Sequence, residues 1–423
     1  MATRPIPGFC CAPSGLQFWV FTGSALTGSA IILRPGFPSM KNLFLLDPNI
    51  TFLNHGSFGA CPEPVFREYQ RWQRELERQP VEFLSRRATA LMAEARAKLA
   101  AYVGADADEV IYYPNPTHAI NMVARSLVLQ PGDEILTTDH EYGAVNRTWH
   151  SLCKKVGAKV VYRAISLPVT TAEEFVEHFW AGVNERTRVI AISHLTSPTA
   201  LIFPVQEICK RARARGILTL IDGAHVPGHL PLNLHDLGCD FYTGACHKWL
   251  SAPKGTAFLY AQHHVQRGLE PLVVSWGWGD DEIAPTLDRG ETQFIRNHEW
   301  QGTRDITAFL TVPMAIEFQQ HHGWDDVRTR CHVLAAETRR RINAITGLES
   351  ICPDSREWFN QMATIRLPPM DLVQLKTRLY AEYKIEVPLI DWNQQHFIRV
   401  SYQGYNTEED METLIRALQQ ILP

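Results

Sequence analysis

Lys248 and Asp222 are the two residues of this sequence whose surroundings most clearly suit them for chemistry. Lys248 follows the apolar pair Phe241–Tyr242 and stands among uncharged neighbours. A lysine amine that is partly removed from water has a lowered pKa and forms imines readily. Asp222 directly follows the apolar run Ile217–Ile221, where a carboxylate needs a cationic partner because burying an unpaired charge is costly. A protonated pyridine nitrogen is such a partner. Taken singly, the two residues could equally be a surface lysine and a helix N-cap.

A third segment, Asn115–Asn121, follows the expected strand Glu109–Tyr113 and opens a helical stretch. A helix N-terminus presents free N–H groups and a positive dipole end, so it can bind phosphate. Asn115 and Thr117 could add side-chain donors, although a simple N-cap would give the same pattern. Ligands of open α/β sheets bind beyond the carboxyl ends of the strands, so we expect the three segments to converge. Together they favour a cofactor with a pyridine ring and a phosphate.

The elements that would position these residues alternate between β-rich runs and amphipathic helical stretches. The expected strands are Glu109–Tyr113, Glu134–Thr138, Lys159–Ala164, Val189–Ser193, Ile217–Ile221, Phe241–Tyr242 and Thr256–Tyr260, with helices near Ala119–Leu127, Val145–Val156 and Val205–Arg215. This alternation predicts an α/β domain with a mostly parallel sheet.

The pattern changes after about Trp300. The expected helices there are Ile306–Gln320, Asp325–Thr346, Met370–Tyr383 and Thr407–Ile421, and the strands are Met362–Leu367, Ile385–Pro388 and Phe397–Tyr402. This predicts a smaller α+β domain. We therefore expect an N-terminal extension over 1–40, a large cofactor-binding domain over 41–300 and a small C-terminal domain over 301–423. The first part of the 41–300 segment is expected to contribute to the small domain.

Charge and cysteine content narrow the class of protein. The net charge of -4 and the lack of a basic stripe argue against a nucleic-acid surface. The nine cysteines are odd in number and form no CxxC pair, which is typical of reduced thiols in a cytoplasmic protein. Pro5–Leu33 carries no charge, which could mark a signal peptide or an anchor. Its prolines and glycines favour a poorly ordered extension instead.

The sequence resembles the class V aminotransferase superfamily of fold-type I enzymes that use pyridoxal 5′-phosphate (PLP). Asp222-x-x-His225 followed by His247-Lys248 is the pattern of that superfamily. Three further segments, Thr51–Pro62, Asp139–Ala144 and Glu299–Asp305, resemble its isopenicillin N epimerase-like group, as does His247–Leu250. The match runs from about Asn49 to the C-terminus. It implies a large domain with a mostly parallel seven-stranded sheet, and a smaller C-terminal α+β domain.

The resemblance also implies a role for each site residue. Lys248 carries the cofactor as a Schiff base and serves as the catalytic base, and Asp222 pairs with the pyridine nitrogen. His225 lies near the phenolic oxygen, and Tyr142 stacks on the ring as a second catalytic residue. The phosphate is surrounded by Asn115, Thr117 and His247, while Ser197 contacts the cofactor oxygen. Thr303 is expected to reach the phosphate of a neighbouring subunit, which implies a homodimer. Arg399 matches the arginine that grips the substrate carboxylate, and Asn54 and His55 are expected near the substrate.

Several outcomes stay open after the Cα proton of an amino-acid substrate is removed. Reprotonation on the other face gives an epimerase, for which Tyr142 or His55 is the candidate acid. Loss of a β-sulfur group gives a C–S lyase, as in ergothioneine-pathway relatives, and reprotonation at the cofactor carbon gives an aminotransferase. Val387–Asn393 lacks the cysteine of cysteine desulfurases, which argues against persulfide chemistry.

Readings from other classes are weaker. A zinc hydrolase using His225, His229 and His235 lacks the His-Glu-x-x-His motif, so we expect no metal. No Gly-x-Gly-x-x-Gly follows a strand, which argues against a nicotinamide enzyme. A catalytically silent binding protein with the same fold is disfavoured by the intact Lys248 and Asp222.

Overall fold

The computed structural model describes residues 40–279 and 291–422, so the predicted extension over 1–40 lies almost wholly outside the described residues. A seven-stranded sheet forms the centre, with the strand order β2-β8-β7-β6-β5-β3-β4. Its strands are β2 (Val110–Tyr113), β3 (Glu134–Thr138), β4 (Lys159–Arg163), β5 (Thr187–Ser193), β6 (Leu218–Gly223), β7 (Phe241–Ala245) and β8 (Ala257–Ala261). Only β8 runs antiparallel to its neighbours. The predicted α/β fold with a mostly parallel seven-stranded sheet is confirmed.

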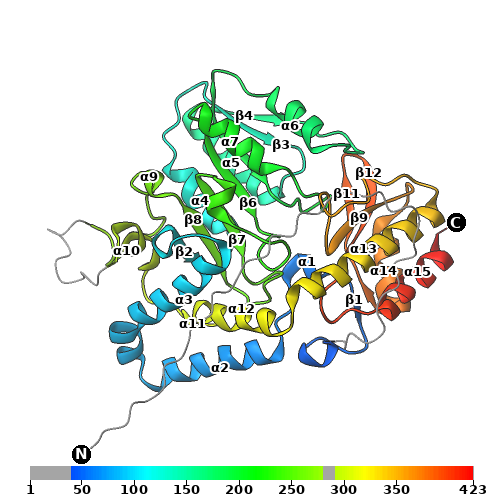
Figure 1. Ribbon diagram of the computed structural model, residues 1–423, viewed down its shortest axis with the longest axis horizontal. Helices are drawn as coiled ribbons and strands as arrows, with labels where there is room; N and C mark the ends of the chain where they lie inside the picture. The colour runs from blue at the N-terminus through cyan, green and yellow to red at the C-terminus, as the bar shows by residue number, and fades with distance from the viewer. Residues whose placement is uncertain (1–39, 280–290, 423) are drawn as a thin grey trace, which may run out of the picture. The chain divides into compact units, whose positions relative to one another are not determined.

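Helices cover both faces of this sheet (Figure 1). One face packs against α4 (Pro116–Ser126), α5 (Gly143–Val156) and α10 (Gln293–Glu299). The other packs against α3 (Ala88–Val103), α6 (Ala172–Trp180), α7 (Val205–Ala214) and α12 (Val312–His321). Side chains along β5 alternate between these two faces. Val189 and Ala191 pack in the apolar cluster on the α4 and α5 side, and Ile190 packs in the cluster on the α6 and α7 side. A strand buried on both faces reads as a continuous apolar run.

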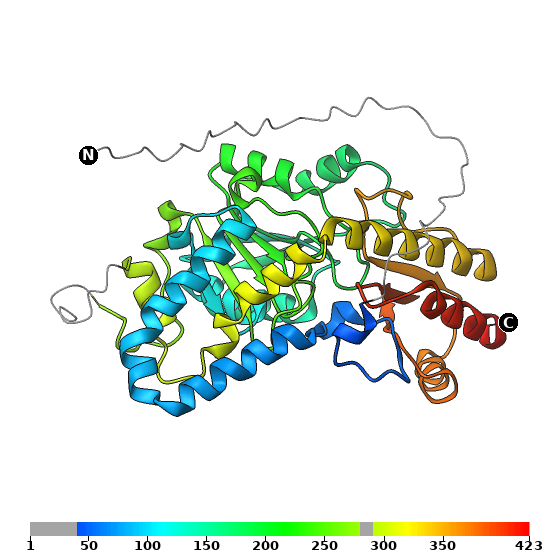
Figure 2. The same ribbon diagram turned by 60° about the horizontal axis from the view of Figure 1, so that its bottom comes forward.

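A second sheet lies in the C-terminal part of the chain. It is antiparallel, with the order β11-β12-β9, and consists of β9 (Met362–Leu367), β11 (Leu389–Trp392) and β12 (Gln395–Ser401). Helix α13 (Trp324–Thr346) packs on β9 and against α15 (Glu408–Ile421), as Figures 1 and 2 show, and α14 (Leu372–Tyr383) packs against β11. The early strand β1 (Thr51–Phe52) pairs with β10 (Ile385–Glu386), which ties the N-terminal segment to this part.

The remaining elements connect these layers. They are the short helices η1 (Lys41–Leu43), α1 (His55–Phe58), η3 (Ala107–Glu109), α8 (Leu234–Leu237), α9 (His263–Gln266) and α11 (Thr307–Leu310), the long helix α2 (Glu63–Arg78) and the π-helical turn η2 (Glu82–Arg87). None of the helices α2, α3 and α6 was among the elements predicted from the sequence.

Two predicted elements are wrong in detail, and proline explains both. The helix predicted over Ile306–Gln320 is divided into α11 and α12, and Pro313 stands in the first turn of α12. A proline there lacks the N–H that would continue the preceding helix. The strand predicted over Ile385–Pro388 stops at Glu386, and β11 begins after Pro388. The boundary near residue 300 stays a prediction. None of the described helices combines the length and apolar character needed to cross a bilayer.

Candidate active site

A cavity opens at the carboxyl ends of the parallel strands. It is lined by Ser57, Phe58, Asn115, Pro116, Thr117, Ile120, Tyr142, Val145, Ser193, Leu195, Ser197, Asp222, Ala224, His225, His247 and Lys248. The three segments singled out in the sequence therefore converge, as expected for the strand ends of an open α/β sheet. Eight of the predicted site residues contribute to this lining, namely Asn115, Thr117, Tyr142, Ser197, Asp222, His225, His247 and Lys248.

Lys248 follows β7 in a tight turn and presents its amine to the cavity. Its Nζ lies 3.2 Å from Nε2 of His225. Removal of the amine from water lowers the pKa of Lys248 to about 8, an effect reinforced by the charge of Arg399 and opposed by Asp222. A larger fraction of the amine is then neutral near neutral pH than at its ordinary pKa, and the neutral amine is the nucleophilic and basic form.

Asp222 is the penultimate residue of β6 and is 7% exposed. Its Oδ1 accepts a hydrogen bond from the backbone N–H of Ala224 at 2.9 Å. Burial raises the pKa of the Asp222 carboxyl, while that hydrogen bond and Lys248 oppose the change. A cation placed in the cavity beside this carboxylate would compensate for its burial, and a protonated pyridine nitrogen supplies one.

The start of α4 and the residue before Lys248 line the same cavity, at the positions where the sequence predicted phosphate binding. Asn115 is the N-cap of α4 and accepts a hydrogen bond from the N–H of His118 at 2.9 Å. His247 Nδ1 donates to the carbonyl oxygen of Thr256 at 2.8 Å, because a carbonyl can only accept. Burial lowers the pKa of His247 to about 4, so the ring is neutral and its Nε2 has no proton. A phosphate dianion beside it would favour the protonated ring, which then becomes a donor.

Glu141 is a buried carboxyl next to this site that the sequence reasoning did not single out. Its Oε1 accepts from the Thr138 hydroxyl at 2.7 Å, and its Oε2 accepts from the Ser193 hydroxyl at 2.5 Å. Burial raises the pKa of Glu141 to about 7, and the charge of Asp222 adds to the rise while both hydroxyls oppose it. Glu141 therefore keeps its proton to a higher pH than an exposed glutamate, and the nearby Asp222 carboxylate contributes to this effect.

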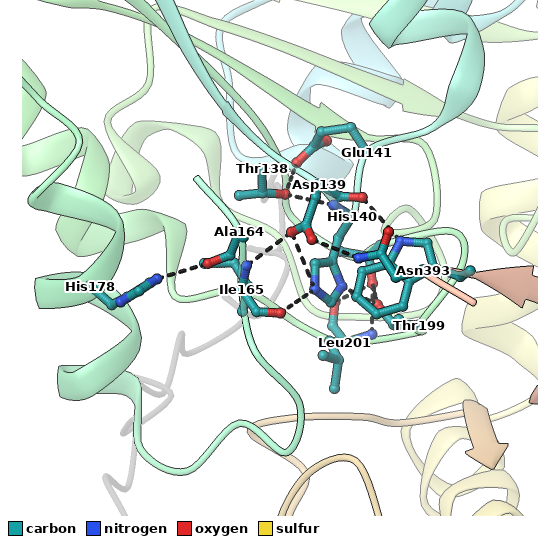
Figure 3. Close-up of polar contacts among 12 residues, drawn as sticks. Thr138, Asp139, His140, Glu141, Ala164, Ile165, His178, Thr199, Leu201 and Asn393 are labelled. Atoms are coloured by element: carbon teal, nitrogen blue, oxygen red, sulfur yellow. Dashed lines mark hydrogen bonds and ion pairs between the residues drawn. The ribbon is translucent and has the colours of Figure 1, made fainter. Parts of the chain in front are cut away.

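The loop that carries Tyr142 is held at Asp139 and His140 (Figure 3). Asp139 Oδ1 accepts from the N–H of Ile165 at 2.9 Å, and its Oδ2 accepts from the amide of Asn393 at 2.9 Å. His140 is buried and shares a hydrogen bond with Thr199 Oγ1 at 2.7 Å. Asn393 belongs to the tight turn between β11 and β12, so the C-terminal sheet braces this loop. Tyr142 itself is 51% exposed at the cavity.

Arg399 on β12 is a buried guanidinium without a carboxylate partner among the described residues. Its Nη1 donates to the backbone carbonyl and hydroxyl of Ser197, and its Nη2 donates to the Ser57 hydroxyl at 3.2 Å. Its Nε is buried and has no hydrogen-bond partner within the described part of the chain. Burial lowers the pKa of Arg399 to about 10, which still leaves it charged at neutral pH. Because Ser57 and Ser197 line the cavity, the unsatisfied charge borders it.

Four predicted residues are not part of this lining, namely Arg399, Asn54, His55 and Thr303. Asn54 donates to Glu386 at 2.8 Å and accepts from Ser57, so it holds Ser57 in place. His55 is fully buried, with Nδ1 3.0 Å from the Tyr405 hydroxyl and Nε2 3.0 Å from the carbonyl oxygen of Lys248. Burial lowers the pKa of His55 to about 3. Thr303 lies in a second cavity with Val81 and Trp276.

The histidines of the zinc reading do not form a ligand group. His235 lies with Asp106 and Glu109, which is the only cluster of possible metal ligands within residues 40–279 and 291–422. His225 and His229 are not part of it. His229 is buried instead, with its Nδ1 3.1 Å from the carbonyl oxygen of His225 and its ring 4.0 Å from that of Trp249.

Four residues of the site were missed by sequence reasoning. Glu141, Ser57 and Phe58 lay inside motifs that had been recognised, but nothing in their types pointed to a role. Phe58 is 74% exposed although it is a large apolar side chain, and it lines the mouth of the cavity. Trp249 donates its indole N–H to Nδ1 of His225 at 3.3 Å. Only the fold reveals these contacts.

The residues present fit PLP. Asp222 is a buried carboxyl with a raised pKa, which a cationic ring nitrogen would stabilise in its charged form. Lys248, an amine with a lowered pKa, lies in the same cavity. The capped N-terminus of α4 also lines this cavity. Asp222, Lys248 and the Asn115–Thr117 turn would hold the ring nitrogen, the aldehyde carbon and the phosphate, respectively.

Comparisons with known proteins agree with this fit. The model of the aminotransferase class-V family matches residues 61–414. The chain is 40% identical to an isopenicillin N epimerase of Amycolatopsis lactamdurans, over 89% of this chain and 96% of that protein. It is 28% identical to a probable chloroplastic L-cysteine desulfhydrase of Arabidopsis thaliana, over 88% and 83%. The apo structure of a cysteine desulfurase from Thermococcus onnurineus superposes with a TM-score of 0.79 at 19% identity, over 92% of this chain and 99% of that one.

Proposed function

Because the chain belongs to the aminotransferase class-V family and has PLP as its cofactor, we propose that it acts at the Cα of an amino acid or amino-acid conjugate, as an isopenicillin N epimerase-like enzyme. The observation that carries this proposal is the unpaired, buried Arg399 beside the cavity that holds the Lys248 amine. A guanidinium with free donors is the group that a substrate carboxylate pairs with best. The amine and the guanidinium thus define the two ends of an α-amino acid.

Lys248 and Tyr142 are the residues proposed to move protons at Cα. When bound, PLP draws electrons away from the Cα of a substrate amine attached to it. Lys248 takes the Cα proton, for which a pKa of about 8 suits an enzyme working near neutral pH. Epimerisation also needs an acid on the opposite side of Cα. Tyr142 is the candidate, because both ring nitrogens of His55 are already engaged by buried partners.

A C–S lyase is the second candidate, and the similarity to a desulfhydrase favours it. Loss of a β-sulfur group needs the same base and carboxylate anchor but no acid on the second face. Transamination would use the same first step and is the third outcome. A persulfide route is disfavoured because Val387–Asn393 contains no cysteine.

The cofactor is tested by the visible absorbance of the purified protein with added PLP. We expect a visible band from the Schiff base, its loss in Lys248→Ala, and its retention in the neighbouring control Lys254→Ala. A wild-type protein that stays colourless would contradict the proposal. The reaction is then assigned in heavy water. Deuterium at Cα together with inversion of its configuration identifies an epimerase, whereas a keto acid released together with a sulfur product identifies a lyase.

We further propose that the protein is a homodimer in which Thr303 reaches the phosphate of the other subunit. Thr303 is exposed and lies apart from the cavity of its own chain. Trp276 and Val81, in the same second cavity, are 79% and 65% exposed, and large exposed apolar side chains mark contact surfaces. Mixing Lys248→Ala with Thr303→Ala subunits should restore one complete site per heterodimer, and therefore part of the visible band. No gain over the separate variants would contradict it.

A cytoplasmic location is the accompanying proposal. It is supported by the cysteines, since the seven that lie within the described residues are free. Fluorescent fusions of residues 1–423 and 41–423 should both distribute through the cytoplasm. Retention of only the longer fusion at a membrane or organelle would contradict it.

A further inference from the structure

The indole of Trp249 contacts the histidine that stands beside Lys248. Trp249 is fully buried, and its Nε1–H donates to Nδ1 of His225 at 3.3 Å. The other ring nitrogen of that histidine, Nε2, lies 3.2 Å from Lys248 Nζ. The His225 ring therefore lies between the indole and the amine. Trp249 and Lys248 are adjacent in the chain, so one turn supplies both neighbours of the ring.

The chemistry of the three groups allows one arrangement of protons. An indole N–H can donate but cannot accept, so Nδ1 of His225 must be the acceptor and carries no proton. Burial keeps the pKa of His225 well below its ordinary value, and the charges of Lys248 and Arg399 and the rings of His229 and His247 act in the same direction. The ring is thus neutral, and a neutral imidazole has one proton, which must be on Nε2.

We propose that Trp249 is a positioning residue that holds the His225 proton on Nε2, so that this N–H points at the amine of Lys248. An N–H donor directed at an amine is favourable only when the amine offers its lone pair. The contact therefore stabilises the neutral form of Lys248, which is the form that attacks an aldehyde or accepts a proton. Without the indole, His225 could place its proton on Nδ1 and accept from a charged lysine instead.

Other groups also act on Lys248, and they do not replace this one. Arg399 disfavours the charged amine and Asp222 favours it, while burial disfavours it most. None of these fixes the direction of the hydrogen bond between the amine and His225. The alternative role of Trp249 is packing, since its ring lies 4.0 Å from that of His229 and 5.0 Å from that of His55. A phenylalanine retains this packing and removes only the N–H.

The test compares Trp249→Phe with wild type and with Trp324→Phe. Trp324 is also buried, but its indole donates to the carbonyl oxygen of Gly228 at 3.0 Å, so it controls for the loss of a buried indole hydrogen bond. The pKa of Lys248 is measured in the full chain without cofactor, from the pH dependence of its acetylation read by mass spectrometry. We expect a rise of about one pKa unit in Trp249→Phe. We expect no change in Trp324→Phe. An unchanged pKa in a folded Trp249→Phe protein would overturn the proposal.

A second measurement needs no Trp249 variant. Nitrogen chemical shifts of ¹⁵N-histidine-labelled wild-type protein distinguish the two neutral tautomers, and His225→Gln identifies the signal. We expect the proton of His225 on Nε2, and a signal with the proton on Nδ1 would refute the inference. The role of the Lys248 amine in the reaction rests on the proposed function. Both measurements use cofactor-free protein, so they succeed or fail independently of whether PLP binds.

Discussion

Replacing Glu141 by glutamine should change the pH dependence of stability in a direction that the structure fixes. Burial raises the pKa of this carboxyl from 4.5 to about 7 in the folded protein. Between those two values the folded chain holds a proton that the unfolded chain has released. Stability therefore falls as pH rises through this interval, because the folded state binds more protons than the unfolded one. At about 1.4 kcal/mol per pKa unit, the full loss is about 3 kcal/mol.

Glutamine is the matched replacement because it has the shape of a protonated carboxyl and stays neutral at every pH. Thr138 and Ser193 can keep their hydrogen bonds to it, since its amide offers both an acceptor and donors. Glu141→Gln should thus resemble wild type near about pH 5 and exceed it in stability by up to about 3 kcal/mol near about pH 8. Glu94→Gln, at an exposed position on α3, serves as the control.

Denaturant unfolding of the cofactor-free proteins at both pH values measures these differences. Comparing each variant with wild type at the same pH cancels the contribution of every other titrating group. The reasoning would be refuted if the difference between Glu141→Gln and wild type were the same at both pH values. It would also fail if the exposed control showed an equal pH-dependent gain.

Three further predictions concern the substrate anchor, a close backbone approach and the braced loop. Arg399→Lys should raise KM for an amino-acid substrate about tenfold or more with a smaller change in kcat, because an ammonium cannot pair with a carboxylate through two parallel bonds; a change confined to kcat in steady-state kinetics would contradict this. Gly59→Ala should lower the thermal unfolding midpoint, because Gly59 has φ +69° and a Cβ would lie 2.1 Å from the carbonyl oxygen of His247; an unchanged midpoint would show that the turn relaxes freely. Asn393→Ala should cost about 1 kcal/mol and speed hydrogen exchange in the loop that carries Asp139, since that carboxylate loses a donor. Unchanged exchange would mean that the C-terminal sheet does not brace the loop.

Much of the fold could be predicted from the sequence because its signals are local. The strands of the central sheet are buried on both faces, so they appear as short apolar runs, and β3 has the same bounds in the prediction and in the structure. Helices α2 and α3 were not predicted although they are long, because α2 buries only Val65 and Leu76 and three of the buried positions of α3 are alanine. The division between α11 and α12 was not predicted because apolar residues continue on both sides of it, and only Pro313 marks the break.

The sequence by itself was enough to predict that Lys248, Asp222 and Asn115 lie at one site. Lys248, Asp222 and Asn115 each follow an apolar strand, and the carboxyl ends of parallel strands must meet at one edge of a sheet. The types and order of these residues were therefore enough to predict that they converge. The same argument could not place His55, which is held by Tyr405 and by the backbone of Lys248.

Only the tertiary structure decided which charges lack partners and which protons are fixed. Ser57 and Arg399 are 342 residues apart and meet across the cavity, and nothing local to either one predicts that contact. The buried Glu141 acquires its raised pKa from its surroundings, and the His225 proton is directed by an indole from a different turn. Burial and hydrogen-bond direction depend on the whole packing arrangement. They are set when segments distant in sequence come together, and they give Lys248 a lowered pKa and a hydrogen-bond partner in His225.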